Sequence, residues 1–569
     1  MPTSSTPAPS LPPAAAPHAE PVRPRPAATT LIVREQAGRL EVLMLLRSAQ
    51  ASFMPATHVF PGGAVDREDE AHLAAADEPV DAIRQRLLLG ELSPALAVAA
   101  LRECFEECGL WLGADLDPGA AGDAHRERLR QARDRLRAGT SDIASLAREL
   151  GLPLCTSALQ PWSHWVTPLG LPKRFDTRFY VTPLPAGQSP VVDAEEATAL
   201  AWWHPADALE RHRAGEFDLA LATRRSLEEL AAHGDVASLL AAAAGLREMA
   251  PRHPRVTRTH AGQRWPILPE HPAYAEVGKL DPTGHGRAYS TLAPGQPVEV
   301  APGVLRLTAP NPGMMTGPGT NTYLLDTGDG GVVVLDPGPL MDDHAQAILA
   351  ACAGRPIRAV LVTHTHIDHA PAAALLPGDA PRIGLPPPVA GRHDGSFTPD
   401  VLPGDSAWFE WGTLRLQALH TPGHASNHVC WWLPREALLF TGDHLMQGST
   451  VVIDPPDGDM AVYLDALRTL PDRLPDMAWL APGHGFLMDR PAWHVARLLA
   501  HRAAREAKVL AALALAAGPS TPADLLPHVY NDVAGRLHRA AERSLLAHLI
   551  KLQGEGRVAE SPDGRWQLN

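Results

Sequence analysis

The chain has 569 residues, 57 of them proline, with 50 Lys and Arg against 64 Asp and Glu and a net charge of −14. At about 150 residues per domain, this length predicts three or four domains and excludes a single small binding module. The acidic balance excludes a basic coat for nucleic acid over the whole chain. Five Cys are too few for a disulfide framework, so we expect reduced thiols in a cytoplasmic protein.

Residues 1–27 are rich in Pro and Ala, which predicts a disordered tail. The tail lacks a basic segment followed by an apolar core, so it is not typical of a secretory signal. No apolar run in the chain approaches the ~20 residues of a membrane span. We therefore expect a cytoplasmic protein with no membrane partner.

The first folded domain is expected over residues 28–250. Residues 29–47 predict two strands joined at Ala37-Gly38, and a glycine-rich turn follows at 60–63. Helical patterns cover residues 81–110, 124–150 and 217–249, and strand patterns return between residues 164 and 204. This mixture predicts an α/β domain.

Three glutamates share one predicted helix of this domain. In RECFEECGL (102–110), Glu103 lies three and four residues before Glu106 and Glu107, so the three carboxylates can lie near one face. Carboxylates this close repel one another unless a cation lies between them. Mg²⁺ or Mn²⁺ suits such oxygen ligands and diphosphate substrates. Gly109 is expected to end the helix.

This segment, together with FPGG at 60–63, resembles the Nudix box, and the flanking EVLMLLRS and KRFDTRFYV resemble Nudix 19-type proteins. The resemblance implies a Nudix α/β/α sandwich that hydrolyses coenzyme A or acyl-coenzyme A at the diphosphate. It implies Glu103, Glu106 and Glu107 as catalytic residues and as ligands of Mg²⁺ or Mn²⁺. Arg102 would orient a carboxylate, and Lys173 and Arg174 are candidates for phosphate contacts.

The box departs from its usual spacing, in which seven residues separate the upstream acidic residue from Arg-Glu. Here 33 residues separate Glu68 from Arg102, and Asp69 stands at the acidic position after Gly63. The identity of the upstream ligand therefore stays open. A non-catalytic binding module remains an alternative for this half.

After this domain, residues 251–294 are rich in Pro, His and Arg with little periodicity, which predicts a linker. Residues 295–490 alternate short apolar runs with helical patterns, as layered α/β domains do. Residues 491–569 predict helices up to Gly554 and then two short strands around a Pro-Asp-Gly turn.

A cluster of metal-ligand types follows the apolar run at 359–362. The segment THTHIDH (363–369) brings His364, His366, Asp368 and His369 to the end of a predicted strand. Three further strand ends carry ligand types after small-residue turns: His424, Asp443 and His484. Imidazole mixed with carboxylate is a ligand set that zinc prefers.

The order of these segments resembles the metallo-β-lactamase superfamily, in which two stacked sheets flanked by helices hold two metals at one edge. Carried over by position, the resemblance implies one Zn²⁺ on His364, His366 and His424. A second Zn²⁺ would lie on Asp368, His369 and His484, with Asp443 bridging the two and Asp368 also catalytic. Such a pair of ions activates water for hydrolysis of an ester, thioester, amide or phosphodiester.

The segments PNPG (310–313) and GTNTYL (319–324) resemble the β-lactamase-like protein 2 group, and residues 491–569 resemble its small C-terminal winged helix. The resemblance leaves two substrate classes open: single-stranded RNA and small-molecule thioesters, the latter as in glyoxalase II-type enzymes. Residues 491–569 carry a net charge of +3, so their cations could contact RNA phosphates. The candidates are Arg536, Arg539, Arg543, Lys551, Arg557 and Arg565.

Overall fold

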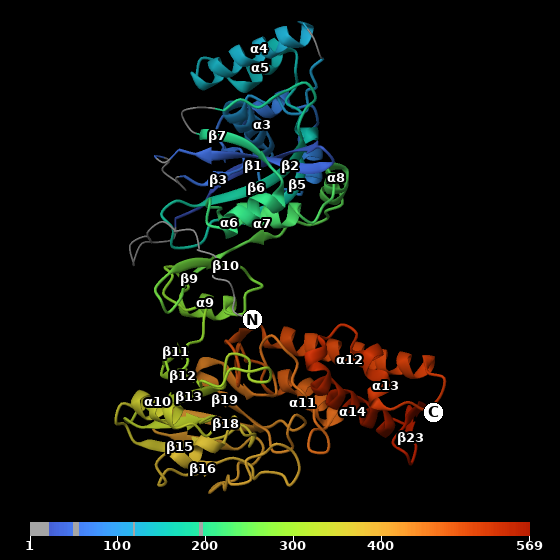
Figure 1. Ribbon diagram of the computed structural model, residues 1–569. Helices are drawn as coiled ribbons and strands as arrows, with labels where there is room; N and C mark the ends of the chain where they lie inside the picture. Colours follow the sequence, from blue (N-terminus) through green and yellow to red (C-terminus); the bar gives the residue numbers. More distant parts are fainter. Residues whose placement is uncertain (1–21, 49, 51–55, 118–119, 193–196) are drawn as a thin grey trace. The chain divides into compact units, whose positions relative to one another are not determined.

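The computed structural model of the chain describes residues 22–48, 50, 56–117, 120–192 and 197–569 (Figure 1). The chain forms two compact units. Unit 1 ends at His271 and also includes Asp281–Ala288, whereas unit 2 combines Pro272–Leu280 with Tyr289–Asn569. Among the described residues, none of the helices combines the length and the apolarity needed to cross a bilayer.

Unit 1 is built around one mixed, eight-stranded sheet in the order β3-β2-β1-β6-β5-β8, with β4 paired to β1 and β7 to β2. The bounds are β1 (Arg25–Gln36), β2 (Arg39–Arg47), β3 (His58–Val59), β4 (Gly62–Ala64), β5 (Gln160–Val166), β6 (Phe175–Pro183), β7 (Ala197–Trp203) and β8 (Pro251–Arg252). The predicted turn at Ala37-Gly38 is confirmed. Both of its residues have positive φ, which matches the twist of a hairpin.

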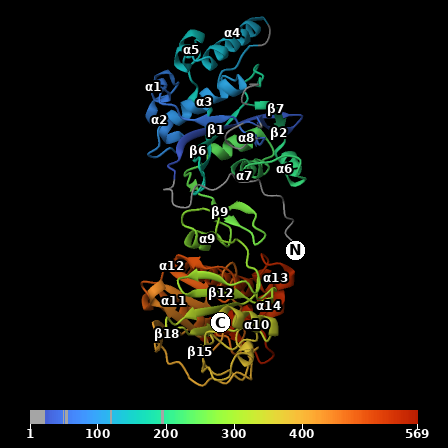
Figure 2. The ribbon, with the colours of Figure 1, turned by 90° about the vertical axis from the view of Figure 1, so that its left-hand side faces the viewer.

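Helices cover both faces of this sheet (Figure 2). They are α1 (Asp69–His72), α2 (Val80–Arg86), α3 (Ala95–Cys108), α4 (Ala120–Arg137), α5 (Ile143–Leu150), α6 (Pro205–Arg213), α7 (Leu221–Leu230) and α8 (Val236–Ala244). Apolar residues of α3 pack with Ala28 and Ile32 of β1 on one face. Residues of α6, α7 and α8 pack with Leu31 and Val33 on the other. The α/β/α sandwich is thereby confirmed.

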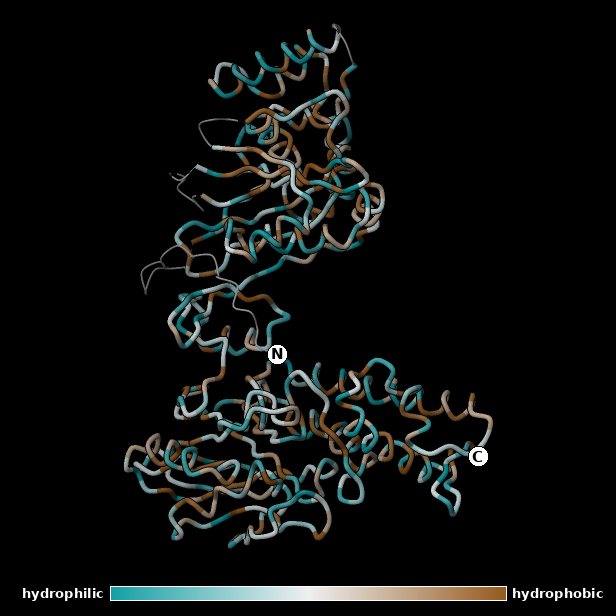
Figure 3. Tube along the Cα trace, in the orientation of Figure 1, coloured by the Kyte–Doolittle hydropathy of each residue, from teal (hydrophilic) through white to brown (hydrophobic). Residues whose placement is uncertain are grey.

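The long helices predicted from periodicity are each divided in two. The stretch 124–150 breaks at Gly139, which has a φ of 65°, and α5 then starts where the Asp142 carboxylate accepts the Ser145 N–H at 2.8 Å. The stretch 217–249 breaks in the same way, because Asp235 caps α8 by accepting the Ser238 N–H at 2.7 Å. The charged helix α4 stands out as largely hydrophilic in Figure 3.

Unit 2 contains two six-stranded sheets packed face to face. The first comprises β11 (Val298–Ala301), β12 (Val304–Thr308), β13 (Asn321–Asp326), β14 (Val332–Leu335), β15 (Ile357–Leu361) and β16 (Arg382–Ile383). The second comprises β17 (Trp408–Trp411), β18 (Leu414–His420), β19 (Val429–Leu433), β20 (Leu438–Gly442), β21 (Trp479–Pro482) and β22 (Met488–Asp489). Their inner faces share one core that includes Leu335, Leu361, Trp431 and Phe440.

Helices flank both sheets of unit 2, which confirms the αββα sandwich. The helix α10 (Asp342–Cys352) packs on the first sheet, and α11 (Met460–Arg473) packs on the second. The C-terminal part is small and has its own core. It consists of α12 (Pro491–Leu515), α13 (Pro522–Val529), α14 (His538–Gly554), β23 (Val558–Glu560) and β24 (Trp566–Leu568). The predicted terminal hairpin is confirmed by the β23–β24 pairing.

The connector expected at residues 251–294 contains regular structure. Its first strand, β8, joins the sheet of unit 1, and a hairpin of β9 (Arg255–Arg258) and β10 (Arg264–Ile267) follows. The helix α9 (Tyr274–Leu280) belongs to unit 2, where the buried Glu276 pairs with Arg306 through two hydrogen bonds of 2.5 and 2.8 Å. Of the disordered tail predicted for residues 1–27, residues 1–21 lie outside the described residues, and β1 already starts at Arg25.

Candidate metal centres

The predicted ligands of unit 2 meet at one edge of its two sheets. His364, His366, Asp368 and His369 follow β15, His424 follows β18, Asp443 follows β20, and His484 follows β21. Two glycines make room for these loops. A Cβ at Gly423 would lie 2.3 Å from the Cα of Tyr463, and one at Gly483 would lie 2.8 Å from the Asp443 Oδ1. Only glycine therefore lets the loops before His424 and His484 approach their neighbours so closely.

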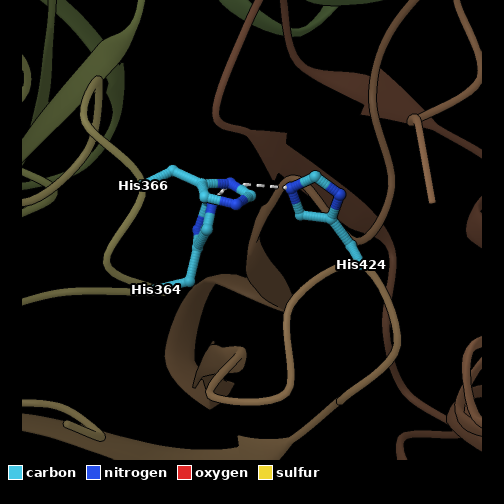
Figure 4. A group of neighbouring side chains, drawn as sticks. All are labelled: His364, His366 and His424. Carbon is cyan, nitrogen blue, oxygen red and sulfur yellow. Dashed lines mark hydrogen bonds between the residues drawn. The ribbon is translucent and has the colours of Figure 1, made fainter. Parts of the chain in front are cut away.

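The side chains form three overlapping groups, and within each group the ligand atoms lie within 4.8 Å of one another. The groups are His364, His366 and His424; His364, His369 and Asp443; and Asp368, His369 and His484. Figure 4 shows the first group, with its three rings turned toward one another. The His366 Nδ1 lies 2.8 Å from the His364 Nε2 and 3.1 Å from the His424 Nε2. The Asp443 carboxylate lies between the groups, because its Oδ1 is 3.4 Å from the His484 Nε2 and its Oδ2 is 3.7 Å from the His424 Nε2.

Three of the imidazoles are oriented through their Nδ1 atoms. The Nδ1 of His369 contacts the Asp336 Oδ2 at 2.9 Å, that of His424 contacts the Val452 carbonyl at 2.8 Å, and that of His484 contacts the Gly319 carbonyl at 3.2 Å. These contacts fix the ring planes and leave each Nε2 directed at the centre. Three of the converging atoms have no hydrogen-bond partner: the Nε2 of His369, the Nε2 of His484 and the Oδ1 of Asp443.

Burial and local charge set the protonation of this cluster. Burial lowers the pKa of His366 to about 3 and also lowers the pKa of His364 and of His424. Burial opposes a charge on His484 too, but Asp443 outweighs it and raises the pKa of His484 to about 9. Burial favours the neutral acid at Asp368, yet the charge of His369 lowers its pKa to about 2. Imidazoles together with ionised carboxylates, some with unpartnered atoms, are a donor set that fits divalent zinc once the ion displaces the protons of His484 and His369.

In unit 1, the three glutamates lie at the C-terminal end of α3. Arg102 organises them, because its Nη1 donates to Glu103 at 2.9 Å and to Glu106 at 3.0 Å. The Glu107 Oε2 accepts the Gly62 N–H at 2.9 Å. A Cβ at Gly63 would lie 2.3 Å from the Glu103 Oε1, so the glycine-rich turn gives this carboxylate its place. Gly109 ends α3 with a φ of 69°, as predicted.

Asp69 completes this arrangement despite the long insertion. Its fully buried carboxylate accepts two hydrogen bonds from Arg102, from Nε at 2.9 Å and from Nη2 at 3.0 Å. Burial raises the pKa of Glu106, which the charge of Arg102 only partly opposes. Asp69 therefore pairs with the arginine, and the carboxylates of α3 are the oxygen donors that suit Mg²⁺ or Mn²⁺.

Comparisons with known proteins agree with this geometry. Residues 315–484 match the family model of the metallo-beta-lactamase superfamily, residues 521–566 match the beta-lactamase associated winged helix domain, and residues 82–224 match the NUDT19 Nudix domain. An atrochrysone carboxyl ACP thioesterase of Passalora fulva is 30% identical over 275 residues, which cover 46% of this chain and 78% of that protein. The chain belongs to the metallo-beta-lactamase superfamily. It joins this hydrolase fold to a Nudix domain.

Two further similarities cover the two halves. A beta-lactamase-like protein 2 homolog of Caenorhabditis elegans is 28% identical over 277 residues, which cover 47% of this chain and 90% of that protein. The crystal structure of a NUDIX hydrolase from Alicyclobacillus acidocaldarius has 29% identity and a TM-score of 0.32, and covers 40% of this chain and 99% of its own.

Three residues next to the metallo-beta-lactamase centre were missed in the sequence. Asp336 accepts from the Thr363 N–H at 2.6 Å as well as contacting His369, and His393 stacks on His366 with its Nε2 3.0 Å from Asp457. Asp336 carries a usable signal, since it follows the apolar run of β14 just as the other ligands follow their strands. His393 and Asp457 lie in loops and carry none. Among the described residues, His428 and His444 lie outside all three ligand groups.

The residues predicted to contact phosphate and those predicted to contact RNA differ in their surroundings. Lys173 is exposed, whereas the Arg174 side chain donates to the carbonyls of Thr167, Pro168 and Val22. Of the six cations proposed for RNA, four form ion pairs with acidic residues of the same unit: Arg543, Lys551, Arg557 and Arg565. The winged helix therefore offers few unpaired cations, and the comparisons give RNA binding no support.

Proposed function

We propose that the chain is a double metallo-hydrolase, in which unit 2 cleaves a small-molecule thioester with two Zn²⁺ and unit 1 cleaves a diphosphate with Mg²⁺ or Mn²⁺. The observation that carries the proposal is the convergence of seven imidazole and carboxylate side chains in unit 2, with unpartnered atoms directed at a common centre. The diphosphate would belong to coenzyme A or an acyl-coenzyme A. One class of substrate would then suit both sites.

In unit 2, His364, His366 and His424 would hold one ion, and Asp368, His369 and His484 the other, with Asp443 bridging them. Two divalent ions at such a site supply Lewis-acid polarisation of a carbonyl and acidify water. The Asp368 side chain is the most exposed carboxylate of the set, at 22% against 11% for Asp443. Asp368 can therefore also accept a hydrogen bond from a water and orient it toward the substrate carbonyl.

Thioesters are favoured over RNA for two reasons. Relatives that share this half of the chain include acyl carrier protein thioesterases. The cations proposed for RNA are largely paired within unit 2, so they offer little unneutralised charge to phosphates. Single-stranded RNA is kept as the competing substrate in the experiment below.

In unit 1, Glu103, Glu106 and Glu107 would hold the Mg²⁺ or Mn²⁺. Arg102 would keep Glu103 and Glu106 in place through its hydrogen bonds to both carboxylates. Glu106, the carboxylate with the raised pKa, could take a proton from the water that attacks the diphosphate. The competing view is a binding module without turnover.

A substrate panel tests both halves in parallel. Wild type, Asp443→Ala and Glu106→Gln are assayed on a coenzyme A thioester, on coenzyme A for release of phosphopantetheine, and on single-stranded RNA. Asp443→Ala should lose thioesterase activity and zinc but keep diphosphatase activity, and Glu106→Gln should do the reverse. The exposed Asp379→Ala and Glu91→Gln serve as controls. Thioester cleavage by Asp443→Ala at the wild-type rate, or cleavage of RNA alone, would refute the assignment for unit 2. Binding without turnover by wild type would refute that for unit 1.

A further inference from the structure

Arg178 is exceptional among the buried arginines of the described residues. Seven arginines are at most 9% exposed, and six of them donate to a carboxylate or a carbonyl: Arg102, Arg133, Arg174, Arg306, Arg502 and Arg505. Arg178 is 5% exposed, and its buried Nε and Nη1 have no hydrogen-bond partner. A buried charge without a partner costs folding free energy, so its retention calls for a ligand that supplies the missing negative charge.

Strand pairing places Arg178 in a row that leads to Glu103. Gly63 of β4 pairs with Ala28 of β1, Ala28 pairs with Arg178 of β6, and Arg178 pairs with His164 of β5. Paired residues point to the same face, and here it is the face that α3 covers, because Ala28 and Tyr180 share a core with that helix. Glu103 lies against Gly63, two strands from Arg178 and thus about 10 Å away along the row.

The residues between and around these two groups favour an anion. Gly63 and Ala28 are the two smallest residues of the row, so the sheet itself places no long side chain between Arg178 and the carboxylate of Glu103. The nearest carboxylate on the same strand is that of Asp176, which is hydrogen-bonded to the His164 ring instead. Asp176 attracts Arg178 but gives it no hydrogen bond, and burial outweighs this attraction and lowers the pKa of Arg178.

We propose that Arg178 binds a phosphate of the diphosphate substrate, next to the phosphate held by the ion at Glu103. This inference rests on the function proposed for unit 1 and adds a substrate-binding residue that the Nudix box does not contain. The planar guanidinium can donate two parallel hydrogen bonds to one phosphate, which a lysine cannot reproduce. Arg178 would then fix the position of the diphosphate relative to the carboxylates of α3.

The test uses the full chain with Mg²⁺ and inorganic pyrophosphate as the probe. Titration calorimetry compares wild type, Arg178→Met, Arg178→Lys and the exposed, ion-paired Arg211→Gln as a control. Loss of a charge-assisted bond to phosphate should weaken pyrophosphate binding about 10- to 100-fold in Arg178→Met and less in Arg178→Lys. Arg211→Gln should bind as wild type does. With coenzyme A as substrate, KM should rise more than kcat falls.

A thermal melt separates binding from a structural role. Because Arg178 is buried without a partner, ligand-free Arg178→Met should melt at or above the wild-type temperature, and pyrophosphate should no longer raise it. A lower melting temperature of Arg178→Met with unchanged pyrophosphate affinity would overturn the proposal. The proposal would also fail if Arg178→Met did not fold while Arg178→Lys bound pyrophosphate as wild type does. If wild type cleaves coenzyme A and Arg178→Met does so with an unchanged KM, this inference fails while the function of unit 1 stands. If wild type binds pyrophosphate through Arg178 but cleaves no diphosphate, the proposed function fails instead.

Discussion

The two candidate metal centres are assembled in opposite ways. In unit 2, seven ligands come from four strand ends spread over residues 364–484, and four of the five histidines are held from behind by a carboxylate, a hydroxyl or a backbone carbonyl. In unit 1, the three glutamates lie within five residues of one helix, and a single arginine holds two of them. The first centre depends on the packing of two sheets, and the second depends on one ion pair, between Arg102 of α3 and Asp69 of α1.

This difference predicts where each centre is vulnerable. In unit 2, three of the atoms directed at the centre lack hydrogen-bond partners, which leaves them available to an ion. In unit 1, the carboxylates already have partners in Arg102 and the Gly62 N–H, so an ion must share them. Unit 1 should therefore respond most to loss of its ion pair, and unit 2 to loss of the groups behind its histidines.

The largest effect is expected for Asp69→Ala in unit 1. Arg102 would stay buried with its main partner gone, and breaking a buried pair in this way costs about 3–5 kcal/mol. Because Arg102 keeps its hydrogen bonds to Glu103 and Glu106, the loss of unfolding free energy should lie toward the lower end of this range. Hydrogen exchange of the α3 amides in urea measures it. Asp66→Ala is the matched control, since Asp66 pairs with the same arginine at 3.4 Å but is 62% exposed and should cost almost nothing. Equal effects of the two variants would contradict the importance given to Asp69.

The second effect concerns Asp336 in unit 2. Asp336→Asn keeps the shape of the side chain but removes the charge that accepts the His369 N–H and the Thr363 N–H. Groups behind a ligand of this kind are worth 10–100-fold in metal affinity, so zinc should bind about that much more weakly on the His369 side. Competition with a chelator measures the affinity, and Asp326→Asn, at a half-exposed carboxylate away from the ligands, provides the control. Retention of two tightly bound ions in Asp336→Asn would show that packing alone orients His369.

The same comparison shows what the sequence could reveal. The ligands of unit 2 follow apolar strands, three of them after a small-residue turn, and that local signal predicted all seven positions that the structure brings together. Asp336 follows the same rule and could have been found. The Asp69–Arg102 pair could not be settled, because an insertion separates the two residues and only the fold shows that α1 returns to α3. His393 and Arg178 depend on contacts between distant strands and loops, which no local pattern encodes.

A third prediction concerns protons. Without an ion, His484 has a pKa of about 9 because Asp443 lies beside it, and the charges of Asp368 and Asp443 raise the pKa of His369 despite burial. Both are therefore protonated at pH 7, and zinc binding must displace those protons. Calorimetry in buffers of different ionisation enthalpy should show release of about one to two protons per chain at pH 7. The release should decline as the pH approaches 9, where His484 is half neutral. No release at pH 7 would mean that His484 and His369 are already neutral there.

The smallest effect is expected where the winged helix supports the metal centre of unit 2. Arg502 of α12 donates to the Val451 carbonyl, the Ser544 Oγ of α14 lies 3.4 Å from the Ile453 nitrogen, and the Val452 carbonyl between them accepts the His424 N–H. Arg502→Ala should loosen this segment and weaken zinc binding on the His424 side by about tenfold, the lower limit for groups behind a ligand. Ser544→Ala, which removes a long and weak bond, should change it less. Chelator competition should show the first effect without any change on the His369 side, because His369 is held by Asp336, which follows β14 of the first sheet. If both sides weaken equally, the winged helix stabilises unit 2 as a whole and does not specifically orient His424.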